Sequence, residues 1–234
     1  MKTWKQIWES RISEPIKADG DELLMELLRA DGFDGGGGDS YMTIESWLTY
    51  ISQIKKELLI QETDSLYEVG CGCGPVLYPF YKAGHKIGGL DYSDNLIQQG
   101  KLVMPNTELV AGEASEIDDT PYDFVISNGV FLYFSNFEYA TNVIEKMWKK
   151  ARKGIAILES PDLRQKDILE AKKRAAYVGD DYDERYEGLG HLYYPKSWFL
   201  DFAEQKEASK IVIAPQNIPN YGYNGVRFNC FILK

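Results

Sequence analysis

The stretch that decides the fold is Leu66-Tyr67-Glu68-Val69-Gly70-Cys71-Gly72-Cys73-Gly74-Pro75. It starts as a short apolar run and then carries a glycine at every second position. The apolar run predicts a buried strand, and the glycines predict a tight turn whose backbone a ligand can approach closely. A second acidic residue, Asp91, ends the next predicted strand, roughly 20 residues downstream, a spacing typical of α/β domains that bind nucleosides.

The two segments together resemble a known family. Glu-x-Gly-x-Gly-x-Gly, from Glu68 to Gly74, and the later run Lys86-Ile87-Gly88-Gly89-Leu90-Asp91-Tyr92-Ser93 are similar to the first two motifs of class I S-adenosylmethionine-dependent methyltransferases of the small-molecule type. The dinucleotide fingerprint Gly-x-Gly-x-x-Gly fits less well, because the residue that would complete it is Pro75. The resemblance covers residues 60 to 160.

Strand-like runs alternate with helical stretches from residue 65 onward, which predicts an α/β, doubly wound, Rossmann-like fold. The first five strands are expected at 65–70, 86–91, 108–111, 124–127 and 153–159, and two later β-rich segments at 210–214 and 225–233. The resemblance implies a seven-stranded, mostly parallel sheet with flanking helices, in which the last strand runs antiparallel between the fifth and the sixth.

Two regions lie outside this alternation. Residues 1–62 predict an N-terminal helical cap, which the run Gly35 to Gly38 interrupts as a hinge or tip. Residues 63–234 form the expected methyltransferase domain, with an insertion at about 160–195 after the fifth strand. Connections of that length tend to be lids or substrate-binding elements.

Composition limits the partners and the compartment. The chain has 234 residues, 44% of them hydrophobic, and a formal net charge of −10, which disfavours nucleic acid or an anionic membrane as the main partner. Three cysteines cannot close a disulfide framework and the first residues lack a signal-peptide core, so we expect a cytoplasmic protein. Cys71 and Cys73 have no nearby His or Cys to complete a tetrahedral site, so we expect no metal.

The donor site is expected around the glycine turn. The three glycines allow close approach, and the helix that follows offers free N–H groups to a carboxylate. Asp91 is expected to bind the ribose hydroxyls, with a helix N-cap as its alternative role. The resemblance implies contacts with S-adenosylmethionine, or with its product S-adenosylhomocysteine, from Glu68, Gly70, Cys71, Gly72, Gly74, Asp91, Tyr92, Ser93, Gly112, Glu113, Ala114, Asn128, Gly129 and Val130. Glu113 stands where the family usually has Asp.

The acceptor site is expected beside the 160–195 insertion. Of the two histidines, His85 precedes the second strand and is expected to have a structural role, whereas His191 lies at the end of the insertion. With a pKa near neutrality, His191 is expected to act as general base for a hydroxyl acceptor or to hydrogen-bond it, and a structural loop histidine is the alternative. Further acceptor contacts are expected from Tyr133, Glu159, Tyr193 and Tyr194.

The sequence leaves the acceptor open. A small molecule is expected, and O-methylation is slightly favoured; the acidic, tyrosine-rich stretch 179–187 suits an amine and keeps N-methylation as the alternative. Two other classes also remain, a nicotinamide-dependent oxidoreductase and a non-catalytic S-adenosylmethionine-binding protein. The oligomeric state is left open.

Overall fold

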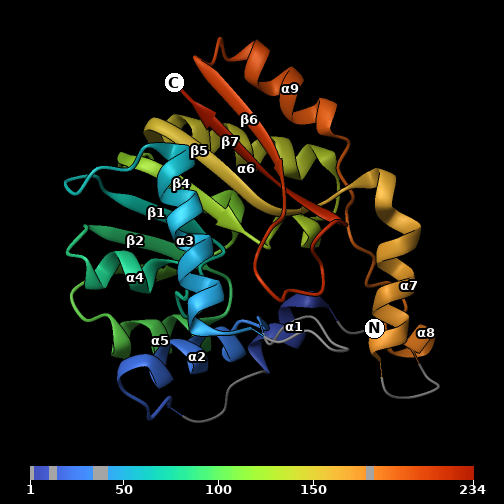
Figure 1. Cartoon of the computed structure of the whole chain (residues 1–234), viewed down its shortest axis with the longest axis horizontal. Coiled ribbons are helices and arrows are strands. Elements are labelled where there is room, and N and C mark those ends of the chain that lie inside the picture. The colour runs from blue at the N-terminus through green and yellow to red at the C-terminus, as the bar shows by residue number, and fades with distance from the viewer. Residues whose placement is uncertain (1–2, 11–14, 34–41, 178–181) are drawn as a thin grey trace.

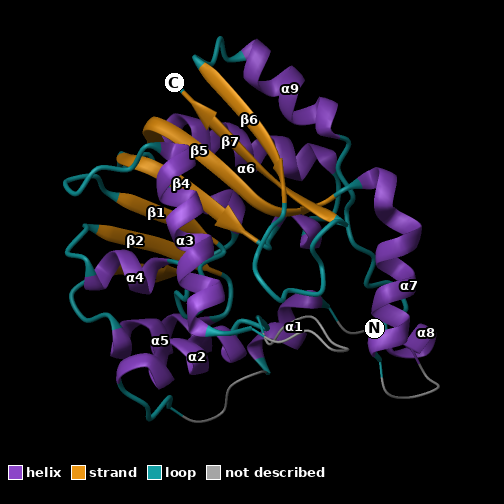
Figure 2. Ribbon diagram, viewed as in Figure 1, coloured by secondary structure: helices purple, strands orange, loops and turns teal. Residues whose placement is uncertain are grey.

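The computed structural model describes residues 3–10, 15–33, 42–177 and 182–234. One sheet with strand order β3-β2-β1-β4-β5-β7-β6 organises the chain (Figures 1 and 2). Its strands are β1 (Leu66–Val69), β2 (Ile87–Asp91), β3 (Glu108–Ala111), β4 (Tyr122–Asn128), β5 (Ala151–Pro161), β6 (Lys210–Pro215) and β7 (Arg227–Leu233). The pairs from β3 to β5 are parallel, and β7 is antiparallel to both β5 and β6. The predicted seven-stranded, mostly parallel sheet and the position of the antiparallel strand are confirmed.

Helices flank the sheet and extend beyond one end of it. They are α1 (Trp4–Glu9), α2 (Gly20–Ala30), α3 (Ile44–Leu58), α4 (Leu77–Lys82), α5 (Asp94–Val103), α6 (Phe137–Lys150), α7 (Lys166–Ala176), α8 (Tyr182–Arg185) and α9 (Lys196–Gln205). Three short 3-10 turns, η1 (Ala114–Glu116), η2 (Phe131–Tyr133) and η3 (Leu163–Gln165), lie in the connections. In Figure 1, α3 crosses in front of the sheet and α6 lies behind it. The chain after β5 runs through α7 and α8, where the sequence predicted an insertion.

Each face of the sheet has its own apolar core, because successive side chains of a strand point to opposite faces. One core joins α3 to the sheet through Trp47, Ile54, Leu66 and Phe124, among others. The other joins α6 and α9 to the sheet through Ile144 and further buried residues that include Phe199, Val125 and Ile155. The helices α2 and α3 of the N-terminal region therefore share a core with the sheet, and this fixes where their ends lie relative to the strands.

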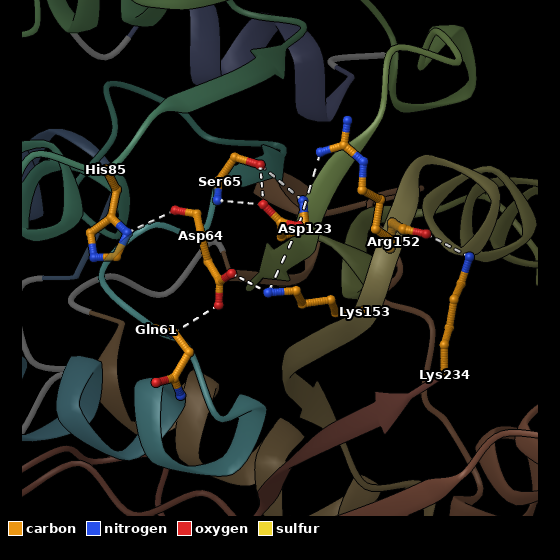
Figure 3. A network of polar contacts seen from close by, with 9 residues as sticks. Gln61, Asp64, Ser65, His85, Asp123, Arg152, Lys153 and Lys234 are labelled. Carbon is orange, nitrogen blue, oxygen red and sulfur yellow. Dashed lines mark hydrogen bonds and ion pairs between the residues drawn. The ribbon is translucent and has the colours of Figure 1, made fainter.

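The amino-terminal edge of the parallel strands is held by a polar network (Figure 3). The backbone N–H and hydroxyl of Ser65 both donate to Asp123 Oδ2, at 2.9 and 2.8 Å, and Lys153 is ion-paired with the buried Asp64. The ring nitrogen Nδ1 of His85 lies 2.8 Å from the carbonyl oxygen of Asp64. His85 is thus a buried structural residue at the edge where the strands begin, as expected. In the described part of the chain, no helix has the length and apolar character to cross a bilayer.

Candidate active site

A cavity of about 1000 Å³ lies at the carboxyl ends of the parallel strands. Its walls come from the turns after β1, β2 and β4, from the end of β5, from η2 and from residues around α1, α2, α7 and α8. This is the edge of an open α/β sheet at which ligands normally bind. One continuous space therefore connects the glycine turn with the chain that follows β5.

Two glycines of the first turn line the cavity at positive φ, Gly70 at 73° and Gly72 at 51°. A Cβ atom on Gly72 would lie 2.2 Å from Oδ2 of Asp31, and one on Gly70 would lie 2.3 Å from Cγ2 of Val130. Asp31 is the C-cap residue of α2. Its Oδ1 accepts a hydrogen bond from the backbone N–H of Cys73 at 3.0 Å. The absence of side chains in this turn therefore makes room for a carboxylate and for a ligand beside it.

Asp91 is fixed at the end of β2 by backbone donors. Its Oδ2 accepts the N–H of Gly72 at 3.0 Å, and its Oδ1 accepts the N–H of Ser93 at 2.8 Å. Burial raises the pKa of Asp91, and these two hydrogen bonds oppose that effect. Ser93 is the N-cap of α5 and accepts the N–H of Leu96 at 3.4 Å, so the capping role suggested for Asp91 is filled by another residue.

Glu68 adds a third carboxyl group beneath the turn. It is 2% exposed, and its Oε2 has no hydrogen-bond partner among the described residues. Burial raises the pKa of Glu68, and the neighbouring carboxylates of Asp31 and Asp91 raise it further. Three acidic groups around one turn make this end of the cavity a favourable place for a cationic ligand.

Asn128 ends β4 and lines the middle of the cavity. Its Oδ1 accepts the hydroxyl of Tyr50, from α3, at 2.9 Å. Its Nδ2 is buried without a partner among the described residues. Because buried donors are nearly always paired in native structures, this amide is suited to a ligand in the cavity.

Glu159 stands at the junction between the glycine turn and the rest of the cavity. A Cβ on Gly129 would lie 3.3 Å from its Oε2. Its φ is +59°, and its backbone N–H donates to Asn229 Oδ1 at 2.9 Å, where the β5–β7 register shifts. The carboxylate binds Nη1 of Arg227 at 2.6 Å and Nε2 of Gln216 at 3.2 Å. Burial alone would lower the pKa of Arg227, but the Glu159 carboxylate holds it above its usual value.

His191 lines the cavity as expected, but its surroundings differ from the expectation. Nζ of Lys173, on α7, lies 3.0 Å from its Nδ1. Burial, with the positive charges of Lys173 and Arg227, lowers the pKa of His191 to about 2. The expectation of a near-neutral pKa is therefore wrong, because the protonated ring would be buried beside two cations. Since an ammonium can only donate, Nδ1 is the acceptor and the ring is neutral, which makes it a weak base.

Aromatic side chains form the outer wall of the cavity. Trp4, on α1, lies with its ring 4.9 Å from that of Tyr133 and 4.7 Å from that of His191. Tyr182 and Tyr186 pack on each other at 4.9 Å. The N-terminal helix and the chain after β5 thus meet through aromatic contacts across the mouth of the cavity.

The structure brings together part of the predicted donor site. The cavity is lined by Gly70, Gly72, Asp91, Tyr92, Asn128, Gly129 and Val130. Glu68, Cys71, Gly74 and Ser93 lie behind this lining: Cys71 is buried, and a Cβ on Gly74 would meet the Met104 side chain. The predicted adenine segment Gly112, Glu113 and Ala114 lies outside the lining, and Glu113 is ion-paired with Lys5 of α1 at 3.3 Å.

Among the predicted acceptor contacts, Tyr133, Glu159 and His191 line the cavity. Tyr194 does not, and this prediction is wrong: the side chain is fully buried in the α6 and α9 core, and its hydroxyl donates to the Phe131 carbonyl at 2.9 Å. Tyr193 is also outside the lining, and its hydroxyl contacts Glu170 and Lys173. The run Gly35 to Gly38 lies outside the described residues, as do Gly179, Asp180 and Asp181.

Sequence reasoning missed four polar residues of the site, Asp31, Tyr50, Lys173 and Arg227. Only Arg227 carried a signal, since an arginine that opens an apolar strand needs a buried partner. The other three reach the site through the packing of helices and have no local motif. Among the residues described, no group of three or more His, Cys, Asp or Glu side chains is arranged to hold a metal ion.

Comparison with known proteins agrees with this geometry. Residues 66–154 match the family described as "Methyltransferase domain". No curated protein matches the chain by sequence. Similar solved structures include magnesium protoporphyrin IX methyltransferase from Synechocystis PCC 6803 with bound SAH, at 14% identity and a TM-score of 0.60, covering 92% of this chain and all of that one.

Two further structures share the fold. The plantazolicin methyltransferase BpumL in complex with SAH is 14% identical, with a TM-score of 0.61, and the match covers 81% of this chain and 82% of that one. A protein from Thermotoga maritima named a "possible histamine N-methyltransferase" is 12% identical, with a TM-score of 0.54 and coverage of 80% and 89%.

Proposed function

We propose that this chain, whose residues 66–154 match a methyltransferase domain and whose fold is that of S-adenosylmethionine-dependent methyltransferases, transfers a methyl group from S-adenosylmethionine to a small-molecule acceptor. The observation that carries the proposal is the cavity, which runs without a break from the glycine turn and Asp91 to a second space lined by Glu159 and His191. A group-transfer enzyme needs both substrates side by side in one water-poor space.

The residues of the first half suit the methyl donor. Gly70 and Gly72 leave the turn open, and Asp91 presents a carboxylate where ribose hydroxyls bind in nucleotide-binding relatives. The acidic side chain of Asp31, which lines this half, suits the positive sulfonium and ammonium groups of S-adenosylmethionine. We propose that α1 and α2 act as a cap over this half, since Trp8 and Asp31 line it.

The second half accommodates a small molecule with oxygen as the favoured nucleophile. Neighbours of the same fold are named for acceptors as different as magnesium protoporphyrin IX and plantazolicin, so the fold leaves the acceptor open. Support for oxygen comes from Asn128, whose buried Nδ2 lacks a partner in the described chain and is suited to an oxygen atom. An amine remains the second candidate because five tyrosines, 177, 182, 186, 221 and 223, line this half.

Turnover tests the proposal. The purified protein is incubated with S-adenosylmethionine and separate pools of hydroxylated, carboxylated and amine metabolites, and release of S-adenosylhomocysteine is measured. We expect release above the acceptor-free background with at least one pool. If the protein binds the donor but no pool stimulates release, a non-catalytic binding protein is the better account. Hydride transfer to or from a nicotinamide cofactor would instead favour an oxidoreductase.

A further inference from the structure

The acceptor half of the cavity is charge-balanced. Three of its carboxylates are each paired with a cation: Glu159 with Arg227 at 2.6 Å, Glu170 with Lys173 at 3.4 Å, and Asp183 with Arg174 at 2.5 Å. They are all the carboxylates that line this half in the described chain. Of these pairs only Glu159–Arg227 is fully buried, with side chains 1% and 8% exposed, and a charged acceptor that displaced one partner would meet the strong cost of breaking a buried pair. The half therefore suits a neutral acceptor.

The outer wall of this half suits a flat ring. Trp4 and Tyr133, together with Tyr177, Tyr182 and Tyr186 from the chain after β5, all line the cavity. The rings of Trp4 and Tyr186 are 6.4 Å apart and contact each other, so they form one aromatic wall on which a ring can pack. Aromatic pairs gain energy beyond the burial of their area when they stack or meet edge to face.

The carboxylate of Glu159 is a polar group that lines the cavity between the aromatic wall and the donor half. Its left-handed backbone conformation costs on the order of 1–3 kcal/mol for a residue other than glycine, and such strain concentrates at active sites. Arg227 and Gln216 each bind one oxygen of this carboxylate. The hydroxyl of Tyr221 also lies within hydrogen-bonding reach of this carboxylate. A carboxylate has about four lone-pair sites, so these three contacts leave one for a donor from the acceptor.

We infer that the acceptor is a neutral aromatic hydroxyl compound, that its O–H donates to Glu159, and that Glu159 takes the proton as the methyl group is transferred. The inference rests on the proposed function. Glu159 is then a catalytic residue, and Arg227 and Gln216 are positioning residues that hold its carboxylate toward the cavity.

The chemical step balances without a further reactant. An oxygen lone pair of the acceptor forms the bond to the methyl carbon, and sulfur keeps the electron pair of the bond that breaks. The O–H bond breaks and its proton moves to the Glu159 carboxylate, which later releases it to solvent. The products are a methyl ether, S-adenosylhomocysteine and a proton. His191 supports the ring through its contact with Trp4 and takes no proton.

The test compares Glu159→Gln with the wild type on two phenols. 4-Methylphenol is neutral in mildly alkaline buffer and needs a base, whereas 4-nitrophenol is mostly ionised and does not. As an anion 4-nitrophenol should be the poorer acceptor of the wild type, so each phenol is compared with its own wild-type rate. We expect Glu159→Gln to lower turnover of 4-methylphenol by about 10²–10⁴-fold, the usual contribution of a positioned base, and to lower turnover of 4-nitrophenol far less. Calorimetry with the S-adenosylhomocysteine complex should show at least about tenfold weaker binding of 4-methylphenol.

Two further variants separate a catalytic effect of Glu159 from an effect on folding. Glu145→Gln, on α6, removes an acid that is also ion-paired, with Lys206 at 2.6 Å, but lies outside the cavity lining; it should leave both phenols unaffected. If Glu159→Gln does not fold, as judged by circular dichroism, Glu159→Asp keeps the ion pair and should still show the selective loss on 4-methylphenol.

Two results would overturn the inference while the donor still binds. One is an equal loss on both phenols, which would make Glu159 structural. The other is a wild-type enzyme that methylates amines or carboxylic acids and no phenol. Failure of the wild type to bind S-adenosylmethionine would instead refute the proposed function itself.

Discussion

Glu159 and His191 line the same cavity, but the charges beside them give them different chemistry. Glu159 has one cation as its direct partner, whereas His191 lies in the field of two. A positive field stabilises a carboxylate and destabilises an imidazolium. Both residues were predicted from the sequence, but the sequence does not show which of them is the better proton acceptor. Lys173 and Arg227 are 18 and 36 residues away from His191 along the chain, and only the fold brings them near it.

The lowered pKa of His191 predicts a pH effect on stability. Below about pH 6.5 the unfolded chain protonates this histidine while the folded protein keeps it neutral, so the free energy of unfolding decreases as the pH falls. Between about pH 7 and pH 5 the wild type should lose up to about 2 kcal/mol more than His191→Gln, which does not titrate and keeps an acceptor for Lys173. Urea unfolding of both proteins at the two pH values measures the difference, and parallel losses would refute it.

At the scale of elements, the N-terminal helices do not only cover the site but also contribute side chains to it. Trp4 lies on α1, Asp31 is the C-cap residue of α2, and Tyr50 lies on α3. The helical character of this region follows from its sequence, because apolar residues recur at helical spacing and Thr43 caps α3 through a hydrogen bond to Ser46 N–H at 3.0 Å. Which of its polar residues face the cavity depends on how the helices dock, and no local pattern records that.

Trp4 tests the role of α1. Its indole Nε1 donates to the Gly190 carbonyl at 3.3 Å, and its ring packs against Tyr133 and His191, so Trp4→Ala removes one wall of the acceptor half. We expect the KM for the acceptor to rise roughly 3- to 10-fold, the scale of one aromatic contact, with the Kd of the donor little changed. Trp148→Ala, a change of the same kind on α6 outside the cavity, is the control. An unchanged acceptor KM in Trp4→Ala would place the acceptor elsewhere.

At the scale of the whole molecule, the seven-stranded sheet was predictable and the second half of the site was not. The glycine turn, Asp91 and the alternation of strands and helices are local signals, and the resemblance supplied the antiparallel last strand. The acceptor half is assembled from the end of β5, the start of β7, α7 and α8, which lie between residues 159 and 227. Tyr194 illustrates what the sequence does not predict, namely the direction of a side chain in this region. Its neighbour Tyr193 contacts Lys173 and Glu170, whereas Tyr194 points into the core.

The central claim is that the glycine turn and Asp91 bind S-adenosylmethionine. Calorimetric titration of the wild type with S-adenosylmethionine and with NAD tests it most directly, alongside Asp91→Ala and, as a control, Asp94→Ala, whose side chain is exposed in the first turn of α5. We expect the wild type to bind S-adenosylmethionine and not NAD. Asp91→Ala should weaken donor binding by roughly 1.5–3 kcal/mol, the scale of hydrogen bonds to a charged group, and Asp94→Ala should not. Binding of NAD with no response to S-adenosylmethionine would contradict the account.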